Sequence, residues 1–264
     1  MNPIRVIVHG AAGKVGQEVV KAVCGEDDVV LVGAVDMKAA KDSLLLPDGS
    51  SSVPFSTDLG DILARCQPDV MVDFSIAKAT MPAVRLAAGK GVNLVIGTTG
   101  FSPGEVKEIE GLTAEHNIGA VMAPNFALGA ILMMHLAKIA AKYLDYAEII
   151  ELHHHLKADA PSGTAQMTAR AMAEARGKPF LQPQGKAAPS RGESVEGVSV
   201  HSVRLPGLMA HQEVILGAPG QTLSIRHDTI NRECYMPGVM LAIREVVKRK
   251  GLVYGLDTLL GLRE

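Results

Sequence analysis

The sequence predicts an α/β protein in which a doubly wound parallel sheet precedes a second, α+β domain built on an open mixed sheet. Over the first half of the chain, short runs of β-branched residues alternate with helical patterns. These runs are almost continuously apolar, which is typical of parallel strands covered by helices on both faces. After residue 125 the alternation gives way to one long apolar helix and then to several strands. The chain is therefore expected to contain two domains of different construction.

In the first domain, each predicted strand leads into small or polar residues and then into a helical segment. The predicted strands are residues 4–10, 29–36, 69–75, 93–100 and 118–125. The predicted helices are residues 14–25, 57–66 and 79–91, with one more helical stretch before residue 118. Repeated strand–helix–strand units of this kind indicate parallel neighbouring strands.

The second half begins with an apolar helix at residues 127–142. A strand at 147–155 and a helix at 164–176 follow, and residues 177–197, rich in Pro, Gly, Ser and Gln, predict a mobile loop. Further strands are expected at 198–205, 210–218 and 221–229. The amphipathic final helix, 238–251, could pack back on the first domain. The expected divisions are 1–124, 125–235 and a returning tail at 236–264.

The composition excludes several classes of protein. The chain has 264 residues, 47% of them hydrophobic, and can bury a large core. Its net charge of -2 does not favour nucleic acid or an anionic membrane as the main partner. Three well-separated cysteines disfavour a disulfide framework and a zinc knuckle. With no apolar run long enough to span a bilayer and no signal-peptide pattern, we expect a cytoplasmic protein.

A glycine-rich turn follows the first strand in "VIVHGAAGKVGQEVV". Gly10, Gly13 and Gly16 form a GxxGxxG pattern at a helix start, where free N–H groups and the helix dipole favour a pyrophosphate. Asp36 ends the second predicted strand, where a carboxylate can bind the hydroxyl groups of an adenosine ribose. Together these features predict a Rossmann-type dinucleotide-binding domain.

Two further loops, "DFSIAKA" and "GTTGFS", follow strand ends that belong to the same edge of the predicted sheet. Ligands of open α/β sheets bind at this edge, so residues 97–100 could bring backbone groups close to a nicotinamide carboxamide, although an ordinary turn is the alternative. The Tyr-x-x-x-Lys proton relay of short-chain dehydrogenases is absent, because no tyrosine is followed by a lysine four residues later. The catalytic groups must therefore lie elsewhere.

The stretch "ELHHHLKADAPSGTA" combines histidines, a lysine and a helix start. On a strand, His153, His155 and, if the extended conformation persists, Lys157 would share one face, while His154 takes the other. Ser162 is a plausible helix N-cap, and Gly163 and Thr164 then expose N–H groups in the first turn. A lysine beside a helix N-terminus suits a carboxylate.

Other interpretations of this stretch are weaker. Zinc needs three or four convergent ligands, and neighbouring histidines on opposite faces of a strand cannot all converge, so we expect no metal. Histidines held by structural hydrogen bonds remain an alternative, above all for His155. The combination of histidine, lysine and helix start favours catalysis.

These residues resemble the signature of the dihydrodipicolinate reductase family. The resemblance extends to "GAAGKVG", "VDFS", "VIGTTGFS", "APNFALG", "RLPGLMAHQEVILGAPGQTLSIRHDT" and "NRECYMPGV". It implies that NADH or NADPH reduces the cyclic, dianionic imine derived from 4-hydroxy-tetrahydrodipicolinate to tetrahydrodipicolinate, in the diaminopimelate route to lysine. It also implies a homotetramer. The alternating apolar residues of the second domain's strands suggest that this domain mediates the assembly.

The resemblance assigns roles to individual residues. It makes His153 and Lys157 the candidates for proton delivery, His154 a substrate contact, and Gly163 with Thr164 the carboxylate-binding helix start. It adds Arg232 to the anionic site. The expected cofactor contacts are Gly10, Ala12, Gly13, Lys14, Val15, Gly16, Asp36, Phe74, Gly97, Thr98, Thr99, Pro124, Asn125 and Phe126. His155 and Leu156 depart from more polar residues in some relatives and are not assigned.

The cofactor preference depends on the stretch "VGAVDMKAAKD". Asp36 favours NADH because a 2′-phosphate would meet a like charge, and Met37 stands where enzymes that prefer NADPH usually have an arginine. Lys14 and Lys38 could still reach a phosphate, so we expect NADH to be preferred or both cofactors to be used.

Two alternative functions are weaker fits to the sequence. One is an NAD(P)-dependent amino-acid or semialdehyde dehydrogenase built on the same two-domain plan. A semialdehyde dehydrogenase that oxidises through a thioester would need a nucleophilic cysteine, which no neighbouring motif supports. A dinucleotide sensor without catalysis would not need lysine, histidine and an anion site together.

Overall fold

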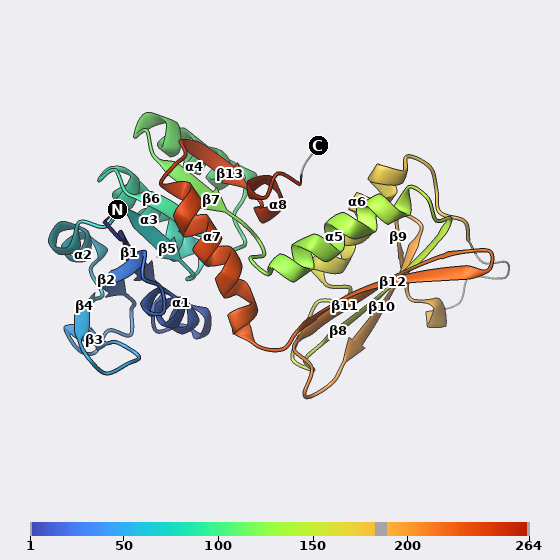
Figure 1. Cartoon of the computed structure of the whole chain (residues 1–264), viewed down its shortest axis with the longest axis horizontal. Coiled ribbons are helices and arrows are strands. Elements are labelled where there is room, and N and C mark those ends of the chain that lie inside the picture. The colour runs from blue at the N-terminus through green and yellow to red at the C-terminus, as the bar shows by residue number, and fades with distance from the viewer. Residues whose placement is uncertain (1, 183–188, 263–264) are drawn as a thin grey trace. The chain divides into compact units, whose positions relative to one another are not determined.

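The computed structural model describes residues 2–182 and 189–262, which form two compact units (Figure 1). The first unit contains Met1–Leu128 and Arg232–Glu264, and the second contains Gly129–Asn231. The unit boundaries thus fall at residues 128 and 231, compared with the expected 124 and 235. The C-terminal segment, expected to form a returning tail, belongs to the first unit.

The first unit contains a sheet of eight strands in the order β13-β7-β6-β5-β1-β2-β4-β3. All neighbouring strands run parallel except β3 and β4, which pair antiparallel at one edge. The strands are β1 (Ile4–His9), β2 (Val29–Val35), β3 (Ser43–Leu45), β4 (Ser52–Ser56), β5 (Val70–Asp73), β6 (Asn93–Ile96), β7 (Gly119–Met122) and β13 (Gly251–Tyr254). This arrangement confirms the predicted doubly wound α/β fold.

Helices cover this sheet because their apolar faces match its buried strands. They are α1 (Lys14–Cys24), α2 (Leu59–Cys66), α3 (Ala77–Ala88), α4 (Pro103–Glu115), α7 (Met236–Val246) and the short α8 (Leu256–Leu259). Side chains of α2, α3 and α4 form one core with Ile7, Met71 and Leu94 of the strands. The helix α7 contacts α1, β6 and β7, and Arg244 near its end binds Asp28 and Glu26.

Three strands of this sheet were not predicted. The strands β3 and β4 are short, lie at the edge and contain serine and proline, so they lack a continuous apolar run. The strand β13 has four residues and follows the basic stretch "KRK", yet it pairs with β7 in parallel. The strand β13 depends on a partner distant in sequence, whereas β3 pairs with the nearby β4, which in turn pairs with β2.

The second unit contains a mixed sheet of five strands in the order β12-β11-β8-β10-β9. Only β8 and β10 pair in parallel. Figure 1 shows the helices α5 and α6 on one face of this sheet. The elements are α5 (Leu128–Ala141), β8 (Tyr146–His153), α6 (Gly163–Arg176), β9 (Glu193–Val195), β10 (Val198–Arg204), β11 (Ala210–Ala218) and β12 (Gln221–Thr229), with short 3-10 helices η1 (Pro189–Arg191) and η2 (Arg232–Tyr235), the latter in the first unit. The open mixed sheet is as predicted.

Alternation along the strands gives this sheet a buried and an open face. Ile149, Val200, Val214 and Leu216 point to the helices and form a core with α5 and α6. At the end of α5, the side chain of Arg176 donates to the carbonyl groups of Ala141 and Leu144 and is almost fully buried. This arginine satisfies the carbonyl group of the last residue of α5 and that of Leu144 just beyond the helix.

Part of the predicted loop at residues 177–197 is ordered into η1 and β9. Residues 183–188 of that loop lie outside the described part of the chain. Among the residues described, no helix is both long and apolar enough to cross a membrane.

Candidate active site

The glycine turn of the first unit has a backbone that only glycine can adopt. Gly10 has φ +85°, and a Cβ there would lie 2.6 Å from the carbonyl oxygen of Phe74. A Cβ at Gly16 would overlap the carbonyl group of Gly10. The helix α1 therefore packs directly against the turn, as a close helix–strand approach requires.

The start of α1 is suited to an anion. Gly13 is the N-cap and provides no side-chain acceptor, and the first turn contains no acidic residue. The exposed Lys14 is the first helical residue and Val15, half-buried, is the second. The helix dipole and the uncapped N–H groups favour a pyrophosphate at this point.

Asp36 follows β2 and reaches the glycine turn. Its Oδ2 atom accepts a hydrogen bond from the backbone N–H of Ala12 at 2.9 Å, and its Oδ1 atom accepts one from Lys38 N–H at 2.9 Å. The side chain of Met37 is 84% exposed beside it. The structure thus brings Asp36 and the glycine turn together.

An aromatic cluster is formed by Phe74, which follows β5, and Phe126, which comes after β7, beside Gly97 at the end of β6. The rings of Phe74 and Phe126 are 5.7 Å apart between centroids, and a Cβ at Gly97 would overlap the ring of Phe74. Thr98 is buried, whereas Thr99 is exposed. Pro124 and Asn125 lead into Phe126, and the Asn125 side chain accepts a hydrogen bond from the N–H of Ala127. The expected nicotinamide contacts are therefore near one another within the first unit.

In the second unit, a buried carboxylate orients His153. Glu151 lies two residues earlier on β8, and its Oε2 atom is 2.5 Å from His153 Nδ1. Arg204 of β10 donates to both carboxylate oxygens, at 2.7 and 2.8 Å, and Ser162 N–H donates at 3.2 Å. Because Nδ1 donates to the carboxylate, Nε2 is the ring nitrogen of His153 that is left for chemistry.

These hydrogen bonds keep Glu151 ionised although it is buried. Burial alone would raise the pKa of Glu151, but hydrogen bonds from His153 and Arg204 lower it to about 2. A carboxyl group with a lowered pKa contributes stability that is present above its unfolded pKa of about 4.5 and lost as the pH falls towards 2.

The unfolding free energy should therefore fall on acidification partly through Glu151. We expect this residue to account for roughly 3 kcal/mol between about pH 5 and pH 2. Urea unfolding at several pH values, compared between the wild-type chain and Glu151→Gln, measures this contribution. Identical pH dependences in the two proteins would contradict it.

The predicted common face for His153, His155 and Lys157 is wrong. The strand β8 ends at His153, and Lys157 N–H donates to the carbonyl group of His154 at 3.1 Å, which closes a turn. His154, His155 and Leu156 are exposed on this turn. The Nζ atom of Lys157 instead binds the carboxylate of Asp159 at 2.7 and 2.8 Å. The extended conformation does not persist beyond His153, because the residues after it have no partner on a neighbouring strand.

The helix α6 starts as predicted from its cap. Ser162 is the N-cap, and its hydroxyl group accepts a hydrogen bond from Ala165 N–H at 3.2 Å. Gly163 is exposed and Thr164 half-buried in the first turn, which contains no acidic residue.

Arg232 is not in this unit: it is the first residue of η2, in the first unit.

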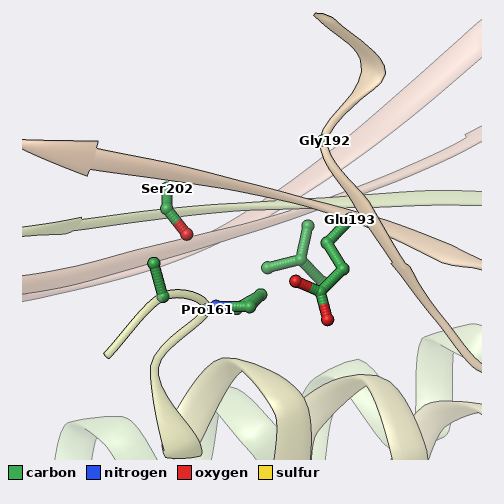
Figure 2. Close-up of a pocket in the computed structure, with 6 residues that line it drawn as sticks. Pro161, Gly192, Glu193 and Ser202 are labelled. Carbon is green, nitrogen blue, oxygen red and sulfur yellow. The ribbon is translucent and has the colours of Figure 1, made fainter. Parts of the chain in front are cut away.

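A shallow hollow lies beside the loop that leads to α6 (Figure 2). Pro161, Ser202 and Glu193 face it, and its volume is about 320 Å³. The carboxylate of Glu193 would repel an anion. The hollow is therefore poorly suited to an anion.

The alternatives raised from the sequence gain no support within the described residues. No cluster of three or more potential metal ligands occurs there. Burial raises the pKa of the Cys24 and Cys66 thiols, which opposes formation of a nucleophilic thiolate.

Comparisons with known proteins establish the family. The chain matches the description "Dihydrodipicolinate reductase, N-terminus" over residues 4–126 and "Dihydrodipicolinate reductase, C-terminus" over residues 129–260. It belongs to the dihydrodipicolinate reductase family. A 4-hydroxy-tetrahydrodipicolinate reductase from Dehalococcoides mccartyi is 60% identical over 99% of this chain and 100% of its own. One from Moorella thermoacetica is 48% identical over 97% of this chain and 98% of its own.

Solved structures support the same assignment. A dipicolinate-bound dihydrodipicolinate reductase from Paenisporosarcina sp. TG-14 has a TM-score of 0.86 and 40% identity, and the match covers 97% of this chain and 99% of that one. The resemblance inferred from the sequence motifs is thereby confirmed.

Three polar residues that form hydrogen bonds with predicted site residues or with each other were not identified from the sequence. Glu151 lies two residues before His153 and shares its face of the strand. This spacing alone could have indicated that Glu151 is near His153. Arg204 is 53 residues away and becomes its partner only through the pairing of β8 with β10. Asp73, a buried carboxylate at the end of β5, was likewise not singled out.

Proposed function

We propose that the chain catalyses the NAD(P)H-dependent reduction of the cyclic imine derived from 4-hydroxy-tetrahydrodipicolinate to tetrahydrodipicolinate. This reaction belongs to the diaminopimelate route of lysine biosynthesis. The proposal is carried by the match, over 99% of the chain, to a relative named for this activity. The residues of each unit support it separately: the first unit contains the glycine turn, and the second contains an oriented histidine and a helix start that suits an anion.

The residues of the first unit fit a dinucleotide. The pyrophosphate is assigned to the glycine turn and the start of α1, where glycine is required and no side chain caps the helix. The adenosine ribose is assigned to Asp36. The nicotinamide is assigned to the aromatic cluster of Phe74 and Phe126 and to residues 97–99. The bound dinucleotide supplies the hydride that reduces the imine.

The substrate is a dianion and needs cationic and N–H donors. We assign one carboxylate to the start of α6, at Ser162, Gly163 and Thr164, and a further contact to His154. Arg232 is assigned to the anionic site as well. The dipicolinate in the structure of the relative from Paenisporosarcina is a dicarboxylate and supports this class of ligand.

His153 and Lys157 are assigned to proton delivery. The hydrogen bond from Nδ1 to Glu151 fixes the ring of His153 and leaves Nε2 for exchange of a proton. The ammonium group of Lys157 can donate a proton or stabilise negative charge that develops during reduction. Both residues belong to the second unit.

An absorbance assay tests this function directly. The wild-type chain, NADH and freshly generated 4-hydroxy-tetrahydrodipicolinate should give substrate-dependent loss of nicotinamide absorbance. Aspartate semialdehyde, tested in parallel with NAD(P)⁺, should give no reduction of the cofactor. Activity with the semialdehyde and none with the imine precursor would overturn the proposal.

We expect NADH to be preferred, or both cofactors to be used with a modest ratio. The carboxylate of Asp36 would repel a 2′-phosphate, whereas the exposed Lys14 and Lys38 partly compensate for this repulsion. The ratio of kcat/KM for NADH and NADPH at low ionic strength measures the balance, because salt screens the lysine contribution. Asp36→Asn should shift the ratio towards NADPH. A preference for NADPH of a hundredfold or more, about 2.7 kcal/mol, would show that the lysines outweigh Asp36.

The chain is proposed to form a homotetramer through the open face of the five-stranded sheet. Ile150, Leu152, Val203 and Ile215 alternate with the buried core residues and are only half-buried. An uncovered apolar sheet face favours packing against another sheet.

Light scattering at micromolar concentration should report a tetramer. Ile215→Glu, on the open face, should yield smaller species, whereas Leu132→Glu on the exposed surface of α5 should not. A monomeric wild-type chain would refute the proposed assembly.

A cytoplasmic location is also proposed, supported by the three cysteines, which are free thiols in the structure.

A further inference from the structure

The first unit contains a polar cluster at the ends of three neighbouring strands, and its central carboxylate has no role in the chemistry assigned so far. Asp73, the last residue of β5, is fully buried. Its carboxylate is hydrogen-bonded to the Nδ1 atom of His9, the last residue of β1, and to the hydroxyl group of Thr98, which follows β6. The hydroxyl groups of Thr80 and Ser75 donate to it at 2.8 and 3.0 Å.

Three of the residues that bind the Asp73 carboxylate are next to, or part of, segments assigned to the cofactor. His9 precedes Gly10 of the glycine turn, and Ser75 follows Phe74. Thr98 is itself the centre of the segment 97–99. The strands β1, β5 and β6 are adjacent in the sheet (Figure 1). One carboxylate therefore joins the segments that leave their carboxyl ends.

The hydroxyl group of Thr98 is engaged on both sides. It donates to Asp73 and accepts a hydrogen bond from the backbone N–H of Ser75 at 2.8 Å. The residue is 6% exposed. A ligand at residues 97–99 therefore meets backbone groups there, and the side chain of Thr98 serves to hold that backbone in place.

The carboxylate is stable in this setting because its donors compensate for the loss of water. Burial alone would raise the pKa of Asp73, but hydrogen bonds from His9, Thr98 and Thr80 lower it. A buried group with this many partners is costly to disturb, and it fixes the segments that donate to it.

We propose that Asp73 is a positioning residue that fastens the glycine turn, the Phe74–Ser75 segment and residues 97–99 together, and so presets the backbone that receives the nicotinamide end of the cofactor. The inference rests on the proposed cofactor site. It assigns Thr98 to positioning through its side chain and to binding through its backbone.

The test compares two ligands in the full-length chain. NADH contains the nicotinamide, whereas ADP-ribose shares the adenosine and pyrophosphate and lacks it. Thr98→Val keeps the shape of the side chain and removes the hydroxyl group. It should raise the Kd for NADH about tenfold, equivalent to about 1.4 kcal/mol, and leave the Kd for ADP-ribose within about twofold of the wild type.

Two further variants separate positioning from general damage. Thr98→Ser retains the hydroxyl group and should restore NADH binding. Thr113→Val removes a buried hydroxyl group of α4 that donates to the carbonyl group of Glu110, so it should lower the melting temperature without changing either Kd.

The outcomes distinguish this inference from the proposed function. Equal weakening of both ligands, or unchanged NADH binding, in Thr98→Val would overturn the positioning role alone. A wild-type chain that binds neither ligand would overturn the cofactor site together with this inference.

Discussion

Replacement of Lys157 by methionine should lower kcat by about 10²- to 10⁴-fold, the range typical of lost acid catalysis and charge stabilisation. The side chain of Lys157 is 21% exposed, and its ammonium group is ion-paired with Asp159 in the segment between β8 and α6. Methionine keeps much of the length and apolar stem and removes the charge. Steady-state kinetics with freshly generated substrate measure the effect.

A lysine elsewhere in the same unit provides the control. Lys142→Met changes an exposed side chain just beyond α5 and should leave kcat near the wild-type value. His153→Ala should also lower kcat, because it removes the ring that Glu151 orients. Near-normal kcat in both Lys157→Met and His153→Ala would overturn the assignment of proton delivery to these residues.

Glu151→Gln should reduce both stability and activity. The substitution preserves size but removes the charge that pairs with Arg204 and His153 inside the second unit. Breaking a buried ion pair by changing one partner costs about 3–5 kcal/mol. Urea unfolding should show a loss of this order, and kcat should fall at least about tenfold, because His153 loses the acceptor that fixes its Nδ1 proton.

The same strand offers a matched substitution. Glu148, three residues earlier, lies on the open face of the sheet and pairs with Arg191 and His201. Its side chain is 34% exposed, so Glu148→Gln should cost less than about 1 kcal/mol and leave kcat unchanged. Similar losses of stability in the two variants would show that burial of Glu151 does not set its importance.

The fold could be predicted where local pattern and tertiary structure agree. The five central parallel strands and the helices α1, α2 and α3 are continuous periodic segments, and each was expected within a few residues of its observed position, whereas α4 was expected only as a helical stretch before residue 118. The edge strands β3 and β4 and the strand β13 were missed, because they are short and are held by pairing: β4 with β2, β3 with β4, and β13 with β7. Strand pairing of this kind is not encoded in a local window of sequence.

The candidate site was predictable to a different degree. The glycine turn could be identified because Gly10 and Gly16 are required by sterics that leave a sequence signature. The common face of His153 and Lys157 could not, since it assumed that β8 continues beyond His153. The polar partners Arg204 and His9 depend on the register of β8 with β10 and of β1 with β5, which emerges only in the folded chain.

Transfer of deuterium tests the central claim, that this chain reduces the imine by hydride transfer from a bound nicotinamide. The wild-type chain is incubated with freshly generated 4-hydroxy-tetrahydrodipicolinate and NADH that carries deuterium at both positions of the nicotinamide C4. Mass spectrometry should find tetrahydrodipicolinate with one carbon-bound deuterium that does not exchange with water, formed in step with the loss of nicotinamide absorbance. Product without deuterium, or no cofactor oxidation in the presence of the substrate, would contradict the account.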